Sequence, residues 1–305
     1  MKILVIGSSN VDITAAVHRF PEKGETVIGE DLRYAFGGKG ANQATACGKL
    51  GGDIVFLTCV GNDTKGHETV AALSENHVDT SYVRFTDRHP TGTAVITVDH
   101  NGDNSIIVIQ GANLDCNKQY LEANEKLFAA CDYVLLQMEI PLDAVERAVE
   151  LAAAHGKKVI LNPAPADPAF RKDLYRHITY ITPNETEVSI MAYGAPGHGV
   201  EESAAKLIEL GVQNVIVTLG CEGSMLVKQD GTSVRIPAHR VEAVDTVAAG
   251  DCYNGALVKA LSEGREIEEA MEYAGMASAL AVTRYGAQKS IPTKEELEAF
   301  GGSHE

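Results

Sequence analysis

The sequence lacks the short motifs that mark the most familiar nucleotide-binding and hydrolytic sites. It contains no G-x-x-x-x-G-K-[ST] phosphate loop, no H-E-x-x-H helix and no G-x-S-x-G ahead of a plausible catalytic triad. The segment after the first expected strand reads Gly7-Ser8-Ser9-Asn10-Val11-Asp12, so the dinucleotide-binding G-x-G-x-x-G is missing as well. A nucleotide site in this chain must therefore be built in another way.

Positive charge is also scarce. Lysine and arginine number 26 against 42 aspartates and glutamates, which leaves a formal net charge of −16 at pH 7. This balance argues against nucleic acid or an anionic membrane surface as the partner. An anionic ligand would have to be held by local donors, helix N-termini or metal ions, because the overall field repels it.

Cysteines and long apolar runs are few. The six cysteines are scattered and form no C-x-x-C pair, which predicts neither zinc nor redox chemistry and indicates a reduced, cytoplasmic setting. The apolar run at residues 3–6 is too short for a secretory signal or a membrane span. With 305 residues, 45% of them hydrophobic, the chain predicts one large folded domain, or one large and one small.

Short β-branched runs alternate with stretches of helical periodicity along most of the chain. One such stretch covers residues 142–152 and has Gly156 as its stop signal. The alternation predicts an α/β fold with a central, mostly parallel sheet flanked by helices. The expected strands lie at residues 3–6, 54–57, 133–136, 159–161, 178–181 and 215–219.

Two segments, residues 11–36 and 93–109, alternate polar and apolar residues with a period of two instead. The second contains Asn101-Gly102, a pair typical of a type I′ hairpin turn. We expect antiparallel strands that pair as a small β-sheet lid over the carboxyl edge of the main sheet, where ligands of α/β proteins bind. The lid is then discontinuous, and residues 1–10, 37–92 and 110–305 form the main α/β domain.

The most informative segment is Val244-Asp245-Thr246-Val247-Ala248-Ala249-Gly250-Asp251, which precedes a helix that we expect to begin near Gly250. Small residues at a helix start leave N–H groups open to an anion, and the helix dipole adds partial positive charge there. Asp251 fits two interpretations equally well. It is either a favourable charge in the first helical turn or a reactive carboxylate beside a bound phosphate.

Two further segments combine polar side chains with a helix start. The segment Gly37-Gly38-Lys39-Gly40-Ala41-Asn42 could contact a hydroxyl-rich ligand, but taken alone it is more simply a glycine-rich helix start. Asn184 and Glu187 lie three residues apart and could orient a hydrated Mg²⁺. Taken alone, the favoured interpretation is a cap, in which Asn184 caps the helix and Glu187 completes a capping box.

Two loops complete the set of candidates. Residues 217–224 hold a glycine-flanked turn that either cradles a nucleotide or, by default, forms a tight hairpin. Residues 283–290 form a polar loop after an apolar helix. Its carbonyl and hydroxyl oxygens suit a hard monovalent cation, although most loops of this composition bind nothing.

The order of these motifs is more specific than any one of them. Asn10-Val11-Asp12, residues 37–42, residues 184–187 and residues 245–251 together resemble the ribokinase family of sugar kinases along essentially the whole chain. Asn162-Pro163-Ala164-Pro165-Ala166 and residues 282–288 also look like segments of that family. The resemblance implies the same α/β fold with a small β lid, and a homodimer formed through that lid.

The resemblance further implies transfer of the ATP γ-phosphoryl group to the 5-hydroxyl of ribose. Asp251 would be the general base, and the N–H groups of Ala248, Ala249 and Gly250 would form the anion hole. The sugar would be bound by Asn10, Val11, Asp12, Gly38, Lys39, Gly40, Ala41, Asn42, Glu139 and Asp251. A kinase for deoxyribose or another furanose is the near alternative, and a catalytically idle sugar-binding protein on the same fold is the distant one.

ATP, Mg²⁺ and a monovalent cation, usually K⁺, are the cofactors that the resemblance implies. The nucleotide would contact Asn184, Thr218, Leu219, Gly220, Cys221, Glu222, Gly223, Gly250 and Gly275, and Asn184 and Glu187 would organise the water shell of Mg²⁺. K⁺ would be bound by the side chains of Asp245 and Ser290 and the carbonyl oxygens of Val247, Ala281, Arg284 and Gly286. Two positions depart from the family pattern: Gly275 replaces a larger polar residue near the adenine, and Cys252-Tyr253 replaces threonine or alanine followed by phenylalanine.

Overall fold

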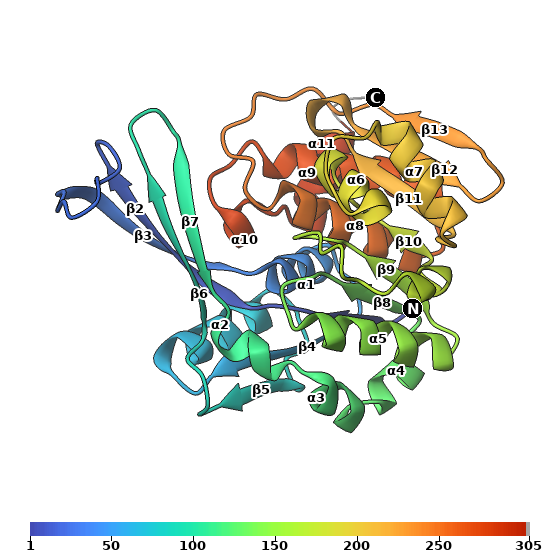
Figure 1. Ribbon diagram of the computed structural model, residues 1–305, viewed down its shortest axis with the longest axis horizontal. Helices are drawn as coiled ribbons and strands as arrows, with labels where there is room; N and C mark the ends of the chain where they lie inside the picture. Colours follow the sequence, from blue (N-terminus) through green and yellow to red (C-terminus); the bar gives the residue numbers. More distant parts are fainter. Residues whose placement is uncertain (303–305) are drawn as a thin grey trace.

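A large sheet organises the structure. The computed structural model describes residues 1–302, and its larger sheet has nine strands in the order β13-β12-β11-β10-β9-β8-β1-β4-β5 (Figure 1). All neighbouring strands between β11 and β5 in this order pair in parallel. At the other end of the sheet, β12 pairs antiparallel with β11, and β13 pairs antiparallel with β12. The strands are β1 Ile3–Ile6, β4 Ile54–Gly61, β5 Val83–Thr86, β8 Tyr133–Leu136, β9 Lys158–Leu161, β10 Tyr180–Ile181, β11 Asn214–Thr218, β12 Ser224–Lys228 and β13 Ser233–Ile236.

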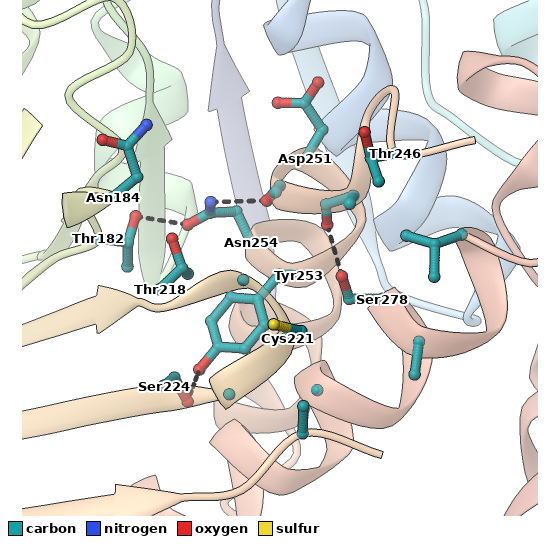
Figure 2. Close-up of a pocket in the computed structure, with 18 of the residues that line it drawn as sticks. Thr182, Asn184, Thr218, Cys221, Ser224, Thr246, Asp251, Tyr253, Asn254 and Ser278 are labelled. Carbon is teal, nitrogen blue, oxygen red and sulfur yellow. Dashed lines mark hydrogen bonds between the residues drawn. The ribbon is translucent and has the colours of Figure 1, made fainter. Parts of the chain in front are cut away.

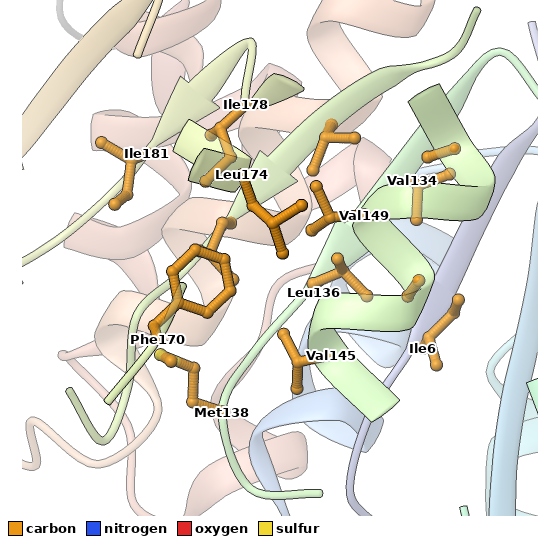
Figure 3. Packing of buried hydrophobic residues seen from close by; sticks show 14 of the residues in the cluster. Ile6, Val134, Leu136, Met138, Val145, Val149, Phe170, Leu174, Ile178 and Ile181 are labelled. Carbon is orange, nitrogen blue, oxygen red and sulfur yellow. The ribbon is translucent and has the colours of Figure 1, made fainter. Parts of the chain in front are cut away.

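Helices cover both faces of this sheet, because its parallel strands are apolar on both sides. In β1, Leu4 and Ile6 belong to one apolar cluster and Ile3 and Val5 to another. Figure 3 shows the first cluster, in which α5 contributes its apolar face. The helices are α1 Lys39–Lys49, α2 Thr64–Glu75, α3 Lys118–Ala123, α4 Lys126–Ala130, α5 Leu142–Ala154, α6 Glu185–Tyr193, α7 Val200–Glu209, α8 Ala249–Ser262, α9 Ile267–Ala281, α10 Ala287–Ser290 and α11 Lys294–Gly301, with 3₁₀ segments η1 Gly111–Asp115, η2 Lys172–His177 and η3 Gly220–Glu222.

The predicted α/β architecture is confirmed, and β1 and β8 span the residues expected for them. β10 is shorter than expected, because Ile178 closes η2 by donating its N–H to Tyr175 O (3.0 Å) and the strand begins only at Tyr180. None of the helices within residues 1–302 has the length and apolar character needed to cross a membrane.

A second sheet of four strands projects from the main body in the order β3-β2-β6-β7 (Figure 1). Its strands are β2 Asn10–Val17, β3 Gly29–Gly37, β6 Gly92–Val98 and β7 Asn104–Ile109. The expected antiparallel pairing is present within each hairpin, β2–β3 and β6–β7, but the two hairpins join through the central β2–β6 pair, which is parallel. β2 follows β1 and β6 follows β5, two parallel strands of the main sheet with β4 between them, so both leave the sheet at the same edge and run outward in the same direction.

The turn between β6 and β7 also differs from the expected type I′ form. Such a turn needs positive φ at both central residues, but only Gly102 of residues 99–103 has one (86°). Asp99 closes this longer loop instead. Its N–H donates to Asp103 O (3.0 Å), and its Oδ1 accepts the N–H groups of Asn101 (2.9 Å) and Asp103 (3.0 Å).

Candidate active site

The N-terminus of α8 opens into a cavity of about 990 Å³. Ala248 precedes the helix in a left-handed conformation (φ 60°, ψ 12°), and a Cβ added to Gly250 would meet no described atom within 4 Å. The N–H groups of the first turn have no acceptor within the helix and lie at the positive end of its dipole, which makes this a candidate anion site. Ala249 N donates to Thr246 O (3.2 Å), so an anion would compete with that bond at one of the three expected donors.

Asp251 lies in the first turn of α8 and is only 6% exposed. Its Oδ2 accepts a hydrogen bond from Asn42 Nδ2 (2.9 Å), and its Oδ1 accepts one from Gln43 Nε2 (3.0 Å). Burial raises the pKa of Asp251, and the opposing effects of Lys39 and the two amides are smaller. A buried carboxylate with a raised pKa beside an anion site is suited to accept a proton.

Lys39 brings a positive charge to the same cavity. It begins α1 directly after Gly38, whose φ of 86° and missing Cβ are both required, because a Cβ would lie 2.8 Å from Asn10 N. Burial lowers the pKa of Lys39, but the carboxylates of Asp251, Glu139 and Glu187 raise it by more, so the net pKa is raised. Lys39 therefore stays charged between these carboxylates.

Asp12 and Glu139 carry further acidic groups to this region. Glu139 follows β8, and its Oε2 accepts hydrogen bonds from Ser8 Oγ (2.6 Å) and Lys39 N (3.0 Å). Burial, with the charges of Glu139 and Asp251, raises the pKa of Asp12 to about 6. Hydrogen-bond acceptors gathered around one lysine match a neutral ligand with several hydroxyl groups.

Asn10 presents its amide in one defined orientation. Its Oδ1 accepts a hydrogen bond from Asn113 Nδ2 (2.7 Å), and Asn113 Oδ1 accepts one from Ser9 N (2.8 Å). The side-chain nitrogen of Asn10 is therefore the atom available to a ligand as a donor. No sequence motif pointed to Asn113, which lies in η1, far along the chain from the other candidate residues.

The side chains of Val11 and Ala41 pack against other parts of the protein, and Gly40 is packed too closely to carry a side chain. Val11 lines a separate cavity of about 170 Å³ beside Tyr34 of β3 and the α10 segment. A Cβ on Gly40 would lie 2.6 Å from the backbone of Gly7, and Ala41 is fully buried in the apolar cluster of α1 and α8. A contact of these residues with a sugar would have to come from their backbone.

The far part of the large cavity is formed by the β11–β12 hairpin and α9 (Figure 2). Gly275 lines it and leaves open space where a side chain would be. The hairpin predicted at residues 217–224 is confirmed, with Thr218 paired to Ser224. The predicted nucleotide contacts Thr218, Gly220, Cys221 and Gly223 line the cavity, whereas Leu219 and Glu222 do not.

The positions of Leu219 and Glu222 follow from local packing. Leu219 is buried in the apolar core, and Glu222 lies 3.9 Å from the guanidinium of Arg235. Gly223 has a φ of 102°, and a Cβ there would lie 2.1 Å from Ile236 O. The turn therefore needs glycine to bring the hairpin close to the end of β13.

Asn184 and Glu187 form the capping box that the spacing favoured. Asn184 Oδ1 accepts from Thr186 N (3.0 Å) and Glu187 N (2.8 Å), and Glu187 Oε2 accepts from Asn184 N (2.9 Å). Burial raises the pKa of Glu187 more than Asn184 N–H and Lys39 lower it, and Asp251 adds to the rise. The cap uses one oxygen of Glu187, and both residues still line the large cavity.

Residues 1–294 match the model of the pfkB family of carbohydrate kinases. The chain belongs to this family. It is 38% identical to the ribokinase of Haemophilus influenzae over 98% of this chain and 97% of that protein, and 35% identical to the deoxyribokinase of Salmonella typhimurium over 98% of both. A solved structure of Arabidopsis thaliana ribokinase complexed with ribose and ATP is 32% identical, with a TM-score of 0.91 over 98% of this chain and 97% of that one.

In this pfkB-family kinase, the predicted cation loop is tied to the segment before α8 by Asp245. Its Oδ1 accepts from Val247 N (3.0 Å) and its Oδ2 from Gly286 N (2.9 Å), which brings these three predicted ligands together. The other three predicted ligands make local contacts. Ala281 O accepts from Arg284 N (3.1 Å), and Ser290 Oγ donates to Ala287 O (2.9 Å).

The kinase also contains buried polar residues near Asp251 to which the sequence analysis gave no role. Gln43 and Asn254 are almost completely buried on α1 and α8, and Thr182 lies at the end of β10. Figure 2 shows Asn254 between Thr182 and the first turn of α8. Their signal in the sequence is weak, because a single amide or hydroxyl within an apolar helix or strand has no characteristic spacing.

Proposed function

We propose that the protein transfers the γ-phosphoryl group of ATP to the 5-hydroxyl of D-ribose, giving ribose 5-phosphate and ADP. One observation carries this proposal: Asp251 lies where the open N-terminus of α8 meets both the hydroxyl-binding group of Asp12, Glu139 and Lys39 and the large cavity. The names of the relatives support ribose as the acceptor.

Asp251 acts as the general base in this proposal. It accepts the proton of the 5-hydroxyl as the oxygen attacks the γ-phosphorus, and the bond to the β-phosphate oxygen breaks. The N–H groups of Ala248, Ala249 and Gly250 stabilise the charge on the transferred phosphoryl oxygens. Lys39, which stays charged among the carboxylates, adds positive charge on the side of the sugar.

The sugar is held by directional contacts. Asn10 offers its amide nitrogen, Asp12 and Glu139 offer carboxylate oxygens, and Asn42 and the start of α1 complete the site. Gly40 and Ala41 contribute only through the α1 backbone.

ATP occupies the far part of the cavity, between the β11–β12 hairpin and α9, with the adenine toward Gly275. Mg²⁺ neutralises phosphate charge when bound. Glu187 would hold the hydrated ion through the carboxylate oxygen that takes no part in the capping box. Asn184 Oδ1 already accepts two N–H groups, so Asn184 would contribute its amide nitrogen, as a donor to a phosphate oxygen. K⁺ binds at the loop pair joined by Asp245, with Val247, Ala281, Arg284, Gly286 and Ser290 as the remaining ligands.

The four-stranded sheet is proposed to be a lid and a homodimer contact. β7 is an edge strand of this sheet, and all of its residues are exposed, including Ile107 at 63%. An exposed apolar edge strand is stabilised by pairing with another chain. We expect Ile107→Lys to shift a dimer to monomer in sedimentation velocity, and a wild-type monomer at micromolar concentration would contradict the proposal.

A reduced, cytoplasmic setting is part of the proposal. All six cysteines are free thiols in the described part of the chain, and five are buried.

A deoxyribose kinase is the second candidate, and the similarity to a deoxyribokinase favours keeping it. Asn10 decides between the two, because its amide nitrogen is the donor suited to a 2-hydroxyl. If Asn10→Ala leaves the ribose to deoxyribose preference unchanged, this specificity argument fails. An idle sugar-binding protein is disfavoured, because Asp251 and the open α8 terminus are both in place.

The first experiment measures ADP release from ATP and Mg²⁺ with D-ribose, 2-deoxyribose, fructose or adenosine. Each acceptor is tested with K⁺ and with tetramethylammonium in its place. Turnover with ribose that requires K⁺ supports the proposed acceptor, the proposed reaction and the proposed cation site together. Turnover only with another acceptor would keep the proposed reaction but assign it to that acceptor. No turnover with any acceptor would favour the catalytically idle sugar-binding protein.

A further inference from the structure

A chain of buried side-chain amides leads to Asp251 from the strand ends behind it. Gln137 Nε2, just after β8, donates to Gln43 Oε1 (2.6 Å). Gln43 Nε2 then donates to Asp251 Oδ1 (3.0 Å) and to Asn162 Oδ1 (3.0 Å). Asn162, just after β9, donates its Nδ2 to Thr182 O (2.9 Å). Gln43 and Gln137 are both fully buried.

Thr182 O, at the far end of this chain of amides, determines which group donates and which accepts in every bond. Thr182 O is a carbonyl and can only accept, so Asn162 must turn its Nδ2 to it and its Oδ1 to Gln43. Gln43 must therefore present its NH₂ group to Asn162 and Asp251, and its oxygen receives the NH₂ of Gln137. Gln43 has no alternative orientation that keeps all of these bonds.

The same chain reaches the first turn of α8 by a second route. Thr182 Oγ1 donates to Asn254 Oδ1 (2.6 Å), and Asn254 Nδ2 donates to Gly250 O (2.8 Å) (Figure 2). The carboxylate of Asp251 and the peptide of Gly250 are thus both tied to the carboxyl ends of the central strands. Neither tie depends on a bound ligand.

We propose that Gln43 is a positioning residue for phosphoryl transfer, which holds the carboxylate of Asp251 in the direction of the acceptor hydroxyl and stabilises its ionised form. This inference rests on the proposed role of Asp251 as general base. Asn42, the other amide on Asp251, belongs to the expected sugar site, whereas Gln43 is enclosed behind the carboxylate. A charged acceptor strengthens such a hydrogen bond, and burial makes its loss costly.

The test compares Gln43→Met with wild type over pH 5 to 9. Methionine keeps the length of the side chain and removes the donor. We expect kcat to fall about 10- to 100-fold, as for one lost hydrogen bond to a charged group. The KM for ribose should change less than about threefold, and the acidic limb of the kcat profile should move to higher pH, because the carboxylate loses a donor that favours its ionised form.

Thr45→Val is the matched control. Thr45 is also fully buried on α1, and its Oγ1 has no hydrogen-bond partner among the described residues. Its replacement alters the same helix without touching the amide chain, so its kcat and pH profile should equal those of wild type. Equal losses in both variants would show a general effect of disturbing α1 and would overturn the proposal.

A double-mutant cycle with Asp251→Asn separates this inference from the proposed function. If Gln43 acts through Asp251, Gln43→Met lowers the residual rate of Asp251→Asn by less than about twofold. The same factor in both backgrounds overturns the inference. Full activity of Asp251→Asn overturns the proposed base itself, and normal kinetics of Gln43→Met with an inactive Asp251→Asn overturn only the role of Gln43.

Gln137→Met keeps the proposal testable if Gln43→Met does not fold. It removes only the donor to Gln43 Oε1 and leaves the bonds of Gln43 to Asp251 and Asn162 in place. We expect a smaller fall in kcat and a pH shift in the same direction, and an unchanged pH profile would contradict the positioning role.

Discussion

The charge state of Asp12 gives a prediction about stability that is independent of catalysis. Burial raises the pKa of this carboxyl from its ordinary 3.8 to about 6, with Glu139 and Asp251 adding to the effect. The folded protein therefore holds a proton on Asp12 more tightly than the unfolded chain does. As pH rises through this interval, the folded state is progressively destabilised relative to the unfolded state.

The predicted magnitude follows from the same values. A rise from 3.8 to about 6 corresponds to about 3 kcal/mol of destabilisation. It is absent below about pH 4 and fully developed above about pH 7. Asp12→Asn removes the titration, so its free energy of unfolding relative to wild type should increase by up to about 3 kcal/mol between pH 4 and pH 7.5. The variant should nevertheless bind ribose more weakly, because it loses an acceptor for sugar hydroxyls.

The assay is urea unfolding of both proteins without ligands at pH 4, 5, 6, 7 and 7.5. A difference between Asp12→Asn and wild type that stays flat with pH would refute the reasoning, because it would mean that Asp12 titrates alike in the folded and unfolded states.

Three further predictions concern single residues. Asp251→Asn should lower kcat at least about 100-fold in the ADP-release assay with little change in ribose affinity, and an unaffected kcat would remove it from the mechanism. Gly223→Ala should lower the free energy of unfolding in urea by about 1–3 kcal/mol, because a φ of 102° is strained for alanine and its Cβ would meet a carbonyl oxygen. Gly231→Ala, with a φ of 84° but open surroundings, should lower it by less. Equal losses in the two variants would contradict the steric contribution of the carbonyl. Asn113→Ala should lose about 1–3 kcal/mol by leaving Ser9 N and Asn10 Oδ1 without their partner, and should also reduce the ribose to deoxyribose preference, which a purely structural role would leave unchanged.

Local features of the fold could be predicted from the sequence because they depend on neighbours in the chain. The apolar runs of β1 and β8, the helix start near Gly250 and the capping box of Asn184 and Glu187 each involve only a few consecutive residues. The type I′ turn at Asn101-Gly102 was a local prediction that failed. Asp99 offers a competing set of hydrogen bonds that a dipeptide signal does not include.

Contacts between distant segments depended on the tertiary structure. Asn42 and Gln43 reach Asp251 across more than 200 residues of chain, and the parallel pairing of β2 with β6 follows from where both hairpins leave the main sheet. The periodicity of apolar side chains indicates which face of a helix is apolar, and capping residues indicate where the helix begins. They do not say which other element that face meets, so Gln43 has no distinguishing pattern in the sequence.

By itself, then, the sequence determined the α/β class, the family, and the segments that we propose supply a general base, an anion site and a sugar site. The tertiary structure decided which atoms of those segments are available: the amide nitrogen of Asn10, one oxygen of Glu187, and a carboxylate of Asp251 already held by two amides. The physical reason is that motifs specify residue types over short spans, whereas burial and hydrogen-bond direction are set by whatever the rest of the chain packs against them.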